Sequence, residues 1–167
     1  MNFDFTNTWS YFDNINNVSY PYLINNHQVP EPGLQPAPLY AGGDGSKGDP
    51  YQITNWAHLY NIRENLGANF TLDADLDQDT AGYDDYVNIT QGWDPIGTES
   101  SSFTGNFEGN NHTISDLEVN RPTVAVGLFG AIKAPGKVTD VHLMDVNILN
   151  GSRTGSLVGY HEGTIKR

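Results

Sequence analysis

Cysteine is absent from the 167-residue chain, and basic residues are scarce. The lack of cysteine excludes disulfides, thiol catalysis, iron–sulfur clusters and zinc sites with cysteine ligands. Only eight Lys and Arg stand against 20 Asp and Glu, which gives a formal net charge of −12. A chain this acidic is a poor binder of nucleic-acid phosphates and anionic lipids, so we expect neither as a partner.

Long apolar runs are also missing. No stretch approaches the roughly 18 apolar residues needed to span a bilayer, so we expect no membrane insertion. The first ten residues lack the basic and apolar regions of a signal peptide. If the protein is exported, we expect this sequence to begin after the signal. The apolar fraction of 37% predicts a small core, or one shared with a neighbour.

The acidic residues are unevenly distributed. Residues 1–120 contain 17 acids and only two bases, Lys47 and Arg63, whereas residues 121–167 contain three acids and six bases. Such polarity favours head-to-tail contact between copies or modules, although a short chain also produces it by chance.

Asn and Gly are the abundant residues, with 18 of each. Both adopt the left-handed backbone conformation more easily than other residues, so the sequence predicts many tight corners. The Asn and Ser/Thr content also creates five N-x-S/T sequons, which indicate secretion only weakly. Their asparagines are Asn17, Asn69, Asn88, Asn111 and Asn150.

Three zones follow one another along the chain. Residues 1–29 are rich in aromatics, and Tyr20 and Tyr22 alternate as in a half-buried strand. Residues 30–38 contain four prolines and predict an extended linker or strap. Residues 39–167 read as one folded unit.

One short helix is predicted over residues 55–66. Leu59, Ile62 and Leu66 occupy one helical face at positions i, i+3 and i+7. Gly67 is placed to terminate this helix. The helix is too short to be stable alone, so we expect it to cap or cover the folded unit.

An internal repeat supplies the strongest prediction. Gly-Leu-Phe-Gly at 127–130 recurs as Gly-Ser-Leu-Val-Gly at 155–159, and Val138 and Ile165 lie 27 residues apart. A repeat of 25–30 residues with short strands and glycine corners predicts a β-solenoid, whose coils stack at about 4.8 Å. The alternative is a β-sandwich with coincidental glycines. The repeat residues are Gly127, Leu128, Phe129, Gly130, Ser156, Leu157, Val158 and Gly159.

These residues resemble the GLUG motif, a short repeat built on Gly-Leu-apolar-Gly. The order of the upstream blocks strengthens the resemblance, which extends over about residues 39–167. The blocks are Gly-Gly-Asp-Gly to Tyr-Gln-Ile at 42–53, Trp-Asp-Pro-Ile-Gly at 93–97, and Phe-Thr-Gly-Asn-Phe-Glu-Gly-Asn-Asn-His-Thr-Ile at 103–114.

The resemblance implies a mainly β fold, a right-handed parallel β-helix of large secreted or cell-surface proteins in bacteria and archaea. These proteins include adhesins and streptococcal immunoglobulin A1 metallopeptidases, in which the repeat is an accessory region. Residues 4–23 resemble the closing element of such a unit, yet here they come first. We therefore expect a piece of a tandem array, truncated at an open C-terminal edge within residues 163–167.

Catalytic signatures are incomplete. His161 and Glu162 begin the zinc-peptidase pattern HExxH, but Ile165 stands where the second His is required. There is no nucleophile elbow, P-loop or dinucleotide fingerprint. A polysaccharide hydrolase or lyase would need paired carboxylates with a basic residue nearby, and no base lies near the acidic cluster. We therefore predict no enzymatic activity in this chain.

A row of alternating aspartates is the one candidate metal site. Extended backbone would place four carboxylates on one strand face, and a calcium ion would relieve their repulsion. The EF-hand template fails, and a solvated acidic turn is the simpler alternative. The four residues are Asp73, Asp75, Asp77 and Asp79. No other cofactor is expected.

Aromatic residues in the acidic loop are candidate ligand-binding residues. Tyr83 and Tyr86 could stack on a sugar if they are exposed, whereas Trp93 is expected in the core. The composition, repeat and resemblance together predict a non-enzymatic extracellular or cell-surface module, serving as stalk, surface coat or adhesin segment. The alternative is an accessory or carbohydrate-binding domain of a secreted peptidase or polysaccharide-active enzyme. Expected partners are neighbouring modules, other copies, and host or matrix glycans or proteins.

Overall fold

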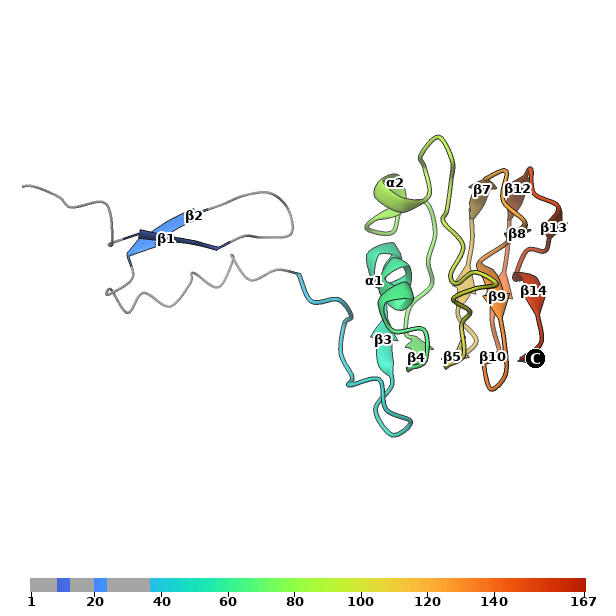
Figure 1. Cartoon of the computed structure of the whole chain (residues 1–167), viewed down its shortest axis with the longest axis horizontal. Coiled ribbons are helices and arrows are strands. Elements are labelled where there is room, and N and C mark those ends of the chain that lie inside the picture. The colour runs from blue at the N-terminus through green and yellow to red at the C-terminus, as the bar shows by residue number, and fades with distance from the viewer. Residues whose placement is uncertain (1–8, 13–19, 24–36) are drawn as a thin grey trace, which may run out of the picture. The chain divides into compact units, whose positions relative to one another are not determined.

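The computed structural model describes residues 9–12, 20–23 and 37–167, which belong to two compact units, Met1–Pro38 and Leu39–Arg167. In the first unit, β1 (Trp9–Phe12) pairs antiparallel with β2 (Tyr20–Leu23) (Figure 1). The strand predicted around Tyr20 and Tyr22 is therefore present. The rest of the predicted element 1–29, and all but the last two residues of the predicted linker 30–38, lie outside the described residues.

The second unit is mainly β, as predicted, with short strands of two to four residues and little helix. Its strands are β3 (Tyr51–Ile53), β4 (Asn69–Leu72), β5 (Asn106–Glu108), β6 (Thr113–Ile114), β7 (Glu118–Asn120), β8 (Ala125–Val126), β9 (Phe129–Ile132), β10 (Lys137–Thr139), β11 (His142–Leu143), β12 (Asn147–Leu149), β13 (Arg153–Thr154), β14 (Val158–His161) and β15 (Thr164–Lys166). Every strand pair within this unit is parallel.

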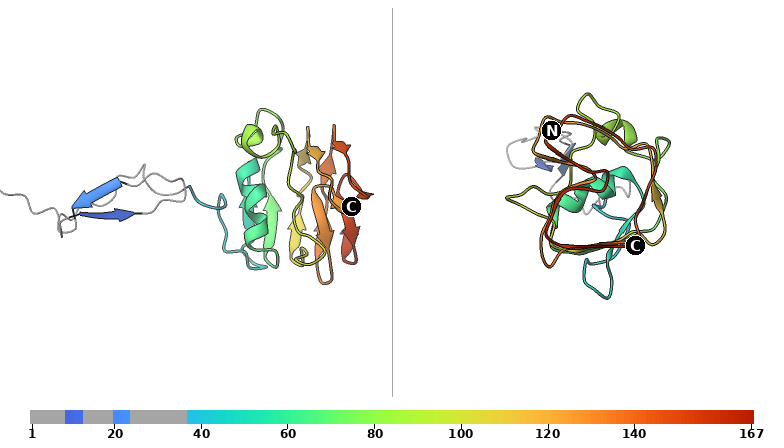
Figure 2. Two further views of the ribbon diagram at one scale, coloured as in Figure 1. Left: turned by 45° about the horizontal axis from the view of Figure 1, so that its top comes forward. Right: turned by 90° about the vertical axis from the view of Figure 1, so that its right-hand side faces the viewer.

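The strands are arranged in five columns. One column is a five-stranded sheet in the order β15-β10-β5-β4-β3, and the others pair β11 with β6, β12 with β7, β13 with β8 and β14 with β9. We call the chain between successive strands of the five-stranded sheet a coil. Seen from the C-terminal side, successive coils overlie one another (Figure 2).

The register of the columns follows the sequence repeat. Val138 pairs with Phe107, 31 residues earlier, and with Ile165, 27 residues later. His142 pairs with Thr113 at a spacing of 29. The pairing of Val138 with Ile165 confirms the strand register that the repeat predicts.

Apolar side chains from successive coils form one core. The rings of Phe103 and Phe129 lie 5.1 Å apart, and those of Phe107 and Phe129 lie 5.7 Å apart. All three side chains are fully buried. Because each coil is only a few strands around, its apolar residues are covered by the coils above and below as much as by residues of the same coil.

The motif glycines permit close packing between coils. A Cβ on Gly130 would lie 2.3 Å from the carbonyl oxygen of Gly97, and one on Gly127 would lie 2.2 Å from that of Gly155. Among the described residues, left-handed corners are formed by six glycines outside the motif and by six short polar residues, which tolerate this conformation. These non-glycine residues are Asn110, Asn111, Asp116, Asp140, Asp145 and Asn150. The motif glycines Gly127 and Gly130 do not have positive φ, so what requires glycine there is the close approach of backbone.

The predicted helix 55–66 is shorter than expected. Helix α1 spans Trp56–Asn61, capped by the side chain of Asn55, and a single 3-10 turn continues to Glu64. The prediction that Gly67 ends the helix is wrong, because Asn65 leaves the helical conformation with φ −139° and ψ 52°. A second helix, α2 (Tyr83–Tyr86), was not predicted and follows the left-handed Gly82.

The two edges of the stack differ. At the first edge, the N–H of Ala41 donates to Gln52 in β3, and Tyr40 stacks on Tyr51 at 4.1 Å. Segment 40–42 and helix α1 thus cover this edge. Strands β11 to β15 have partners on one side only within the described residues.

Replacing Gly130 with alanine tests the close approach between coils. The added Cβ would meet backbone that has no flexible side chain to move aside, so we expect a loss of roughly 1–3 kcal/mol in unfolding free energy. Urea denaturation measures the change. Gly48→Ala is the matched control, because a Cβ added there would have no atom within 4 Å. Equal stability of the two variants would contradict the packing described.

Candidate functional site

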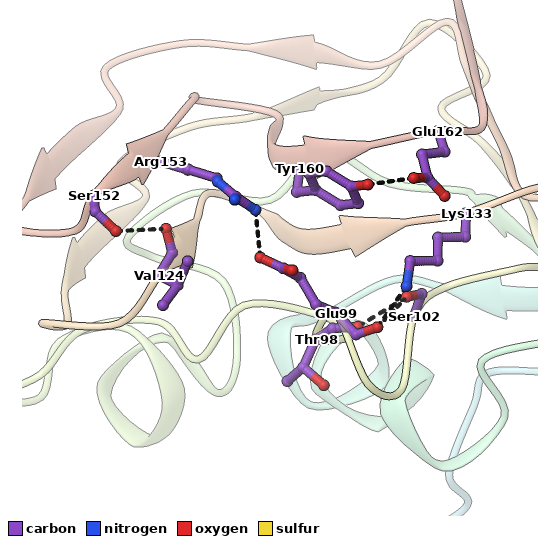
Figure 3. A network of polar contacts seen from close by, with 9 residues as sticks. All are labelled: Thr98, Glu99, Ser102, Val124, Lys133, Ser152, Arg153, Tyr160 and Glu162. Atoms are coloured by element: carbon purple, nitrogen blue, oxygen red, sulfur yellow. Dashed lines mark hydrogen bonds and ion pairs between the residues drawn. The ribbon is translucent and has the colours of Figure 1, made fainter.

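A polar network connects three successive coils on the outside of the stack (Figure 3). Glu99 lies in the loop before the buried Phe103, and Lys133 directly follows β9. Arg153 lies in β13, and Tyr160 lies in β14. The columns bring these residues together although they are far apart in sequence.

The loop that presents Glu99 is held by its own polar groups. The N–H of Thr98 donates to the carbonyl of Ser101 at 2.9 Å, and the hydroxyl of Ser102 donates to the carbonyl of Thr98 at 2.9 Å. Left-handed Gly97 precedes the loop, and fully buried Phe103 ends it. The loop is therefore anchored at its base and projects the Glu99 side chain outward.

Glu99 contacts both later coils. Its carboxylate oxygen Oε1 lies 2.5 Å from Nη1 of Arg153, and its carbonyl accepts from Nζ of Lys133 at 2.7 Å. The ion pair is open to solvent, with side chains 44% and 48% exposed. A pair this exposed contributes about 0.2–1 kcal/mol, so it orients the groups more than it stabilises the fold.

Tyr160 completes the network. Its hydroxyl donates to the carboxylate of Glu162, and this hydrogen bond is the main cause of a raised tyrosine pKa. The phenol therefore stays protonated at neutral pH. The guanidinium of Arg153 lies 5.2 Å from the Tyr160 ring centroid. The network places an aromatic ring, two cations and two carboxylates on one outer face of the stack.

Sequence reasoning did not identify this network. Glu99 and Arg153 are 54 residues apart, which is twice the 27-residue spacing of Val138 and Ile165. An alignment of each coil's sequence with that of the coil two further on would have placed Glu99 opposite Arg153. That alignment requires the length of every intervening coil.

The aspartate row is divided among separate partners. Asp75 accepts from the N–H of Thr113 at 2.8 Å and lies 3.0 Å from Nδ1 of His112. Asp77 accepts from the N–H of Asp79, and Asp73 accepts from a threonine hydroxyl. Within the described residues, no group of three or more potential metal ligands gathers. The calcium site at Asp73, Asp75, Asp77 and Asp79 stays a prediction, without a preformed ligand cluster.

Tyr83 and Tyr86 belong to α2 and are half-buried. The hydroxyl of Tyr83 donates to the carbonyl of Asp116 at 3.0 Å. The ring of Tyr86 stacks on Tyr60 at 4.4 Å. Both tyrosines are thus partly used in packing, Tyr83 beside Trp56 and Tyr86 on Tyr60. Their role in sugar binding stays a prediction, and only the exposed part of each ring is open to a sugar.

Two arginines hold the segment around Trp93. Nε of Arg121 donates to the carbonyl of Trp93 at 3.0 Å, and its Nη1 lies 3.5 Å from the carboxylate of Asp94. The guanidinium carbon of Arg63 lies over the Trp93 ring, 5.3 Å from its centroid. Arg63, one of only two basic residues in residues 1–120, thus packs against an aromatic core residue. Trp93 itself is fully buried, as predicted.

The repeat motif occupies the column of β9 and β14. The N–H groups of Leu128 and Phe129 donate to the carbonyls of Ser156 and Leu157 at 3.0 and 2.9 Å. Leu128 and Phe129 are fully buried, whereas Leu157 and Val158 in the last coil are half-buried. These residues therefore connect successive coils.

Two curated proteins resemble this chain. A Gly-rich membrane protein of Evansella cellulosilytica is 34% identical over 137 residues, which cover 80% of this chain and 16% of that protein. Halomucin of Haloquadratum walsbyi is 35% identical over 129 residues, covering 75% of this chain and 1% of that protein. The chain therefore spans a small part of the length of both relatives.

No protein-family model matches the chain, and no solved structure matches it significantly. In the part of the chain that the structure describes, neither helix has the length and apolar character needed to cross a bilayer.

Replacing Asp75 with asparagine tests its role in joining neighbouring coils. The Thr113 N–H, and then His112, lower the pKa of Asp75 below its ordinary value of 3.8. Because the folded state favours the charged form, this stabilisation is full above that ordinary value and is lost as pH falls through the lowered pKa. We expect Asp75→Asn to lower the urea midpoint at about pH 5–7 and to match the wild type at lower pH.

Asp79→Asn is the control, because the Asp79 carboxylate accepts no hydrogen bond from the described residues. The role assigned to Asp75 is wrong if both variants show the same pH dependence. Melting temperature with and without a calcium chelator, measured on the wild type, separately tests the predicted calcium site.

Proposed function

We propose that residues 39–167 form a right-handed parallel β-helix of the GLUG type, and that it is a non-enzymatic structural module of an extracellular or cell-surface protein. The observation that carries the proposal is the parallel pairing of whole coils at spacings of 27–31 residues, as between Phe107, Val138 and Ile165. Stacked coils build length from a small core and leave few free strand edges along their sides. These properties suit a stalk or surface coat.

The polar network supports a recognition role without catalysis. Glu99 and Glu162 are matched in charge by Arg153 and Lys133, and the Tyr160 phenol is held protonated. Donors, acceptors and a ring on one exposed face favour contact with a polar partner. The names of the relatives, a membrane protein and a halomucin, favour a location at the cell surface.

The last coil supports the proposed contact with a neighbouring module or another copy. Among the residues that the structure describes, its strands are paired on one side only, and its exposed apolar side chains include Met144, Leu149 and Ile165. An unpaired parallel strand edge beside apolar side chains favours the addition of further strands.

A second candidate function is that of an accessory, carbohydrate-binding domain. The observation that favours it is the Tyr160 ring beside Arg153 and two carboxylates, because sugars are bound through ring stacking and polar hydrogen bonds. A host or matrix glycan would be the ligand. A glycan-binding domain can also serve in adhesion. The two candidate functions differ in the partner, which is a glycan here and a neighbouring module or another copy in the first proposal.

Antibody labelling of the cells that produce the protein tests the proposed location. Antibodies against folded residues 39–167 should label intact cells, and protease added outside the cells should remove the signal. The control is a cytosolic protein detected only after lysis. Labelling of the folded unit only after lysis would contradict the proposal.

A further inference from the structure

The sequons differ in whether folding leaves their asparagines accessible. Asn17 lies outside the described residues. The other four are Asn69, Asn88, Asn111 and Asn150, and they occupy unlike positions in the coils. We propose that Asn88, Asn111 and Asn150 are N-glycosylation acceptors in the folded chain and that Asn69 is not. The proposal rests on the extracellular location proposed above.

Asn69 is enclosed by the five-stranded sheet. It begins β4, it is half-buried, and its side-chain Nδ2 donates to the carbonyl of Gly45 at 3.0 Å. Its backbone N–H donates to the same carbonyl. Because β4 lies between β3 and β5 and Asn69 is half-buried, an enzyme can reach its Nδ2 only if this part of the sheet opens.

Asn111 and Asn150 have the opposite setting. Both are exposed, and both adopt the left-handed conformation, with φ of 61° and 66°. Such residues occupy the tips of turns, where the side chain is directed away from the regular backbone pairing. In the Asn150 sequon, Ser152 is exposed as well.

Asn88 and Asn150 are both exposed, and Nδ2 of Asn88 donates to the exposed carboxylate of Asp84 at 2.9 Å. Nδ2 of Asn150 donates to the side-chain oxygen of Asn120 at 2.6 Å, and Nδ2 of Asn120 lies 3.4 Å from the carbonyl of Thr90. Asn120 therefore connects the sequon at 88–90 with that at 150–152. A glycosylated amide keeps one N–H, so the contact from Asn150 to Asn120 is compatible with an attached sugar.

The surface between these two sequons is hollow and partly apolar. A cavity of about 80 Å³ is lined by residues that include Ile89, Asn120 and Leu149. Ile89 and Leu149 are 43% and 52% exposed, and each is adjacent in sequence to a sequon asparagine. The first sugar of either glycan would lie beside this hollow, where its apolar face can cover exposed side chains.

The reaction needs an activated sugar donor, a lipid-linked oligosaccharide. Nδ2 of asparagine forms a bond to C1 of the first sugar, the bond from C1 to the lipid phosphate oxygen breaks, and Nδ2 releases one proton. The lipid phosphate is the leaving group. The sequon hydroxyl, Thr90 or Ser152 for example, is the part of the acceptor recognised with the asparagine.

A purified oligosaccharyltransferase with a lipid-linked oligosaccharide tests the proposal on the folded full chain. Peptides containing each sequon provide the unfolded reference rate, and mass spectrometry gives occupancy at each asparagine. Asn88, Asn111 and Asn150 should react at rates close to those of their peptides. Asn69 should react about tenfold more slowly than its peptide, which corresponds to a cost of about 1.4 kcal/mol for opening the sheet around its half-buried side chain.

Matched variants assign the signals. Thr90→Ala and Ser152→Ala should each remove one glycan while leaving the asparagine in place, whereas Thr71→Ala should leave the number of glycans on the reacted folded chain unchanged. The proposal is overturned if Asn69 in the folded chain reacts as fast as Asn88. It is also overturned if any of the three exposed asparagines reacts at less than about a tenth of its peptide's rate, a tenfold barrier imposed by folding.

This assay does not depend on where the protein is located. Selective reaction in the assay together with antibody labelling only after lysis would refute the surface location and leave the accessibility pattern intact. Surface labelling together with unmodified Asn88, Asn111 and Asn150 in protein isolated from its own cells would refute the glycosylation alone.

Discussion

In-register stacking of coils is the constraint on which the rest of the structure depends. A single coil has strands of only two to four residues and cannot enclose its own apolar side chains. Pairing with the next coil supplies both the hydrogen-bond partners of its backbone and the cover for rings such as Phe103 and Phe129. Close approach at Gly127 and Gly130 makes this pairing possible.

The outer surface is a consequence of the same register. Glu99, Lys133 and Arg153 meet because equivalent positions of successive coils lie one above another. The first edge is covered by segment 40–42 and α1, whereas the last coil has half-buried motif residues and strand edges that no described residue pairs with. The proposed roles follow from this arrangement: length from the stack, recognition from its outer side chains, and contact with further modules at its open edge.

The sequence predicted the repeat more completely than the site. The spacing of Val138 and Ile165 predicted their pairing, because parallel coils place equivalent residues side by side. Helix α2 and the Glu99 network were not predictable in this way. Phe70 pairs with Phe107 at a spacing of 37 residues, so an insertion disrupts the period where these features lie. Short helices and contacts across two coils depend on tertiary packing rather than on local pattern.

Removing one complete coil tests the stacking most directly. Deletion of the 31 residues 108–138 joins Phe107 to Thr139. Because Phe107 pairs with Val138, and Glu108 with Thr139, Phe107 then takes the place of Val138 and the register of the following coil is kept. We expect this variant to keep its β circular dichroism and to unfold in one cooperative transition. Deletion of only 108–122 breaks the register and should abolish folding, although it removes fewer residues. The central role of stacking would be contradicted if the variant lacking 108–122 folds while the variant lacking 108–138 does not.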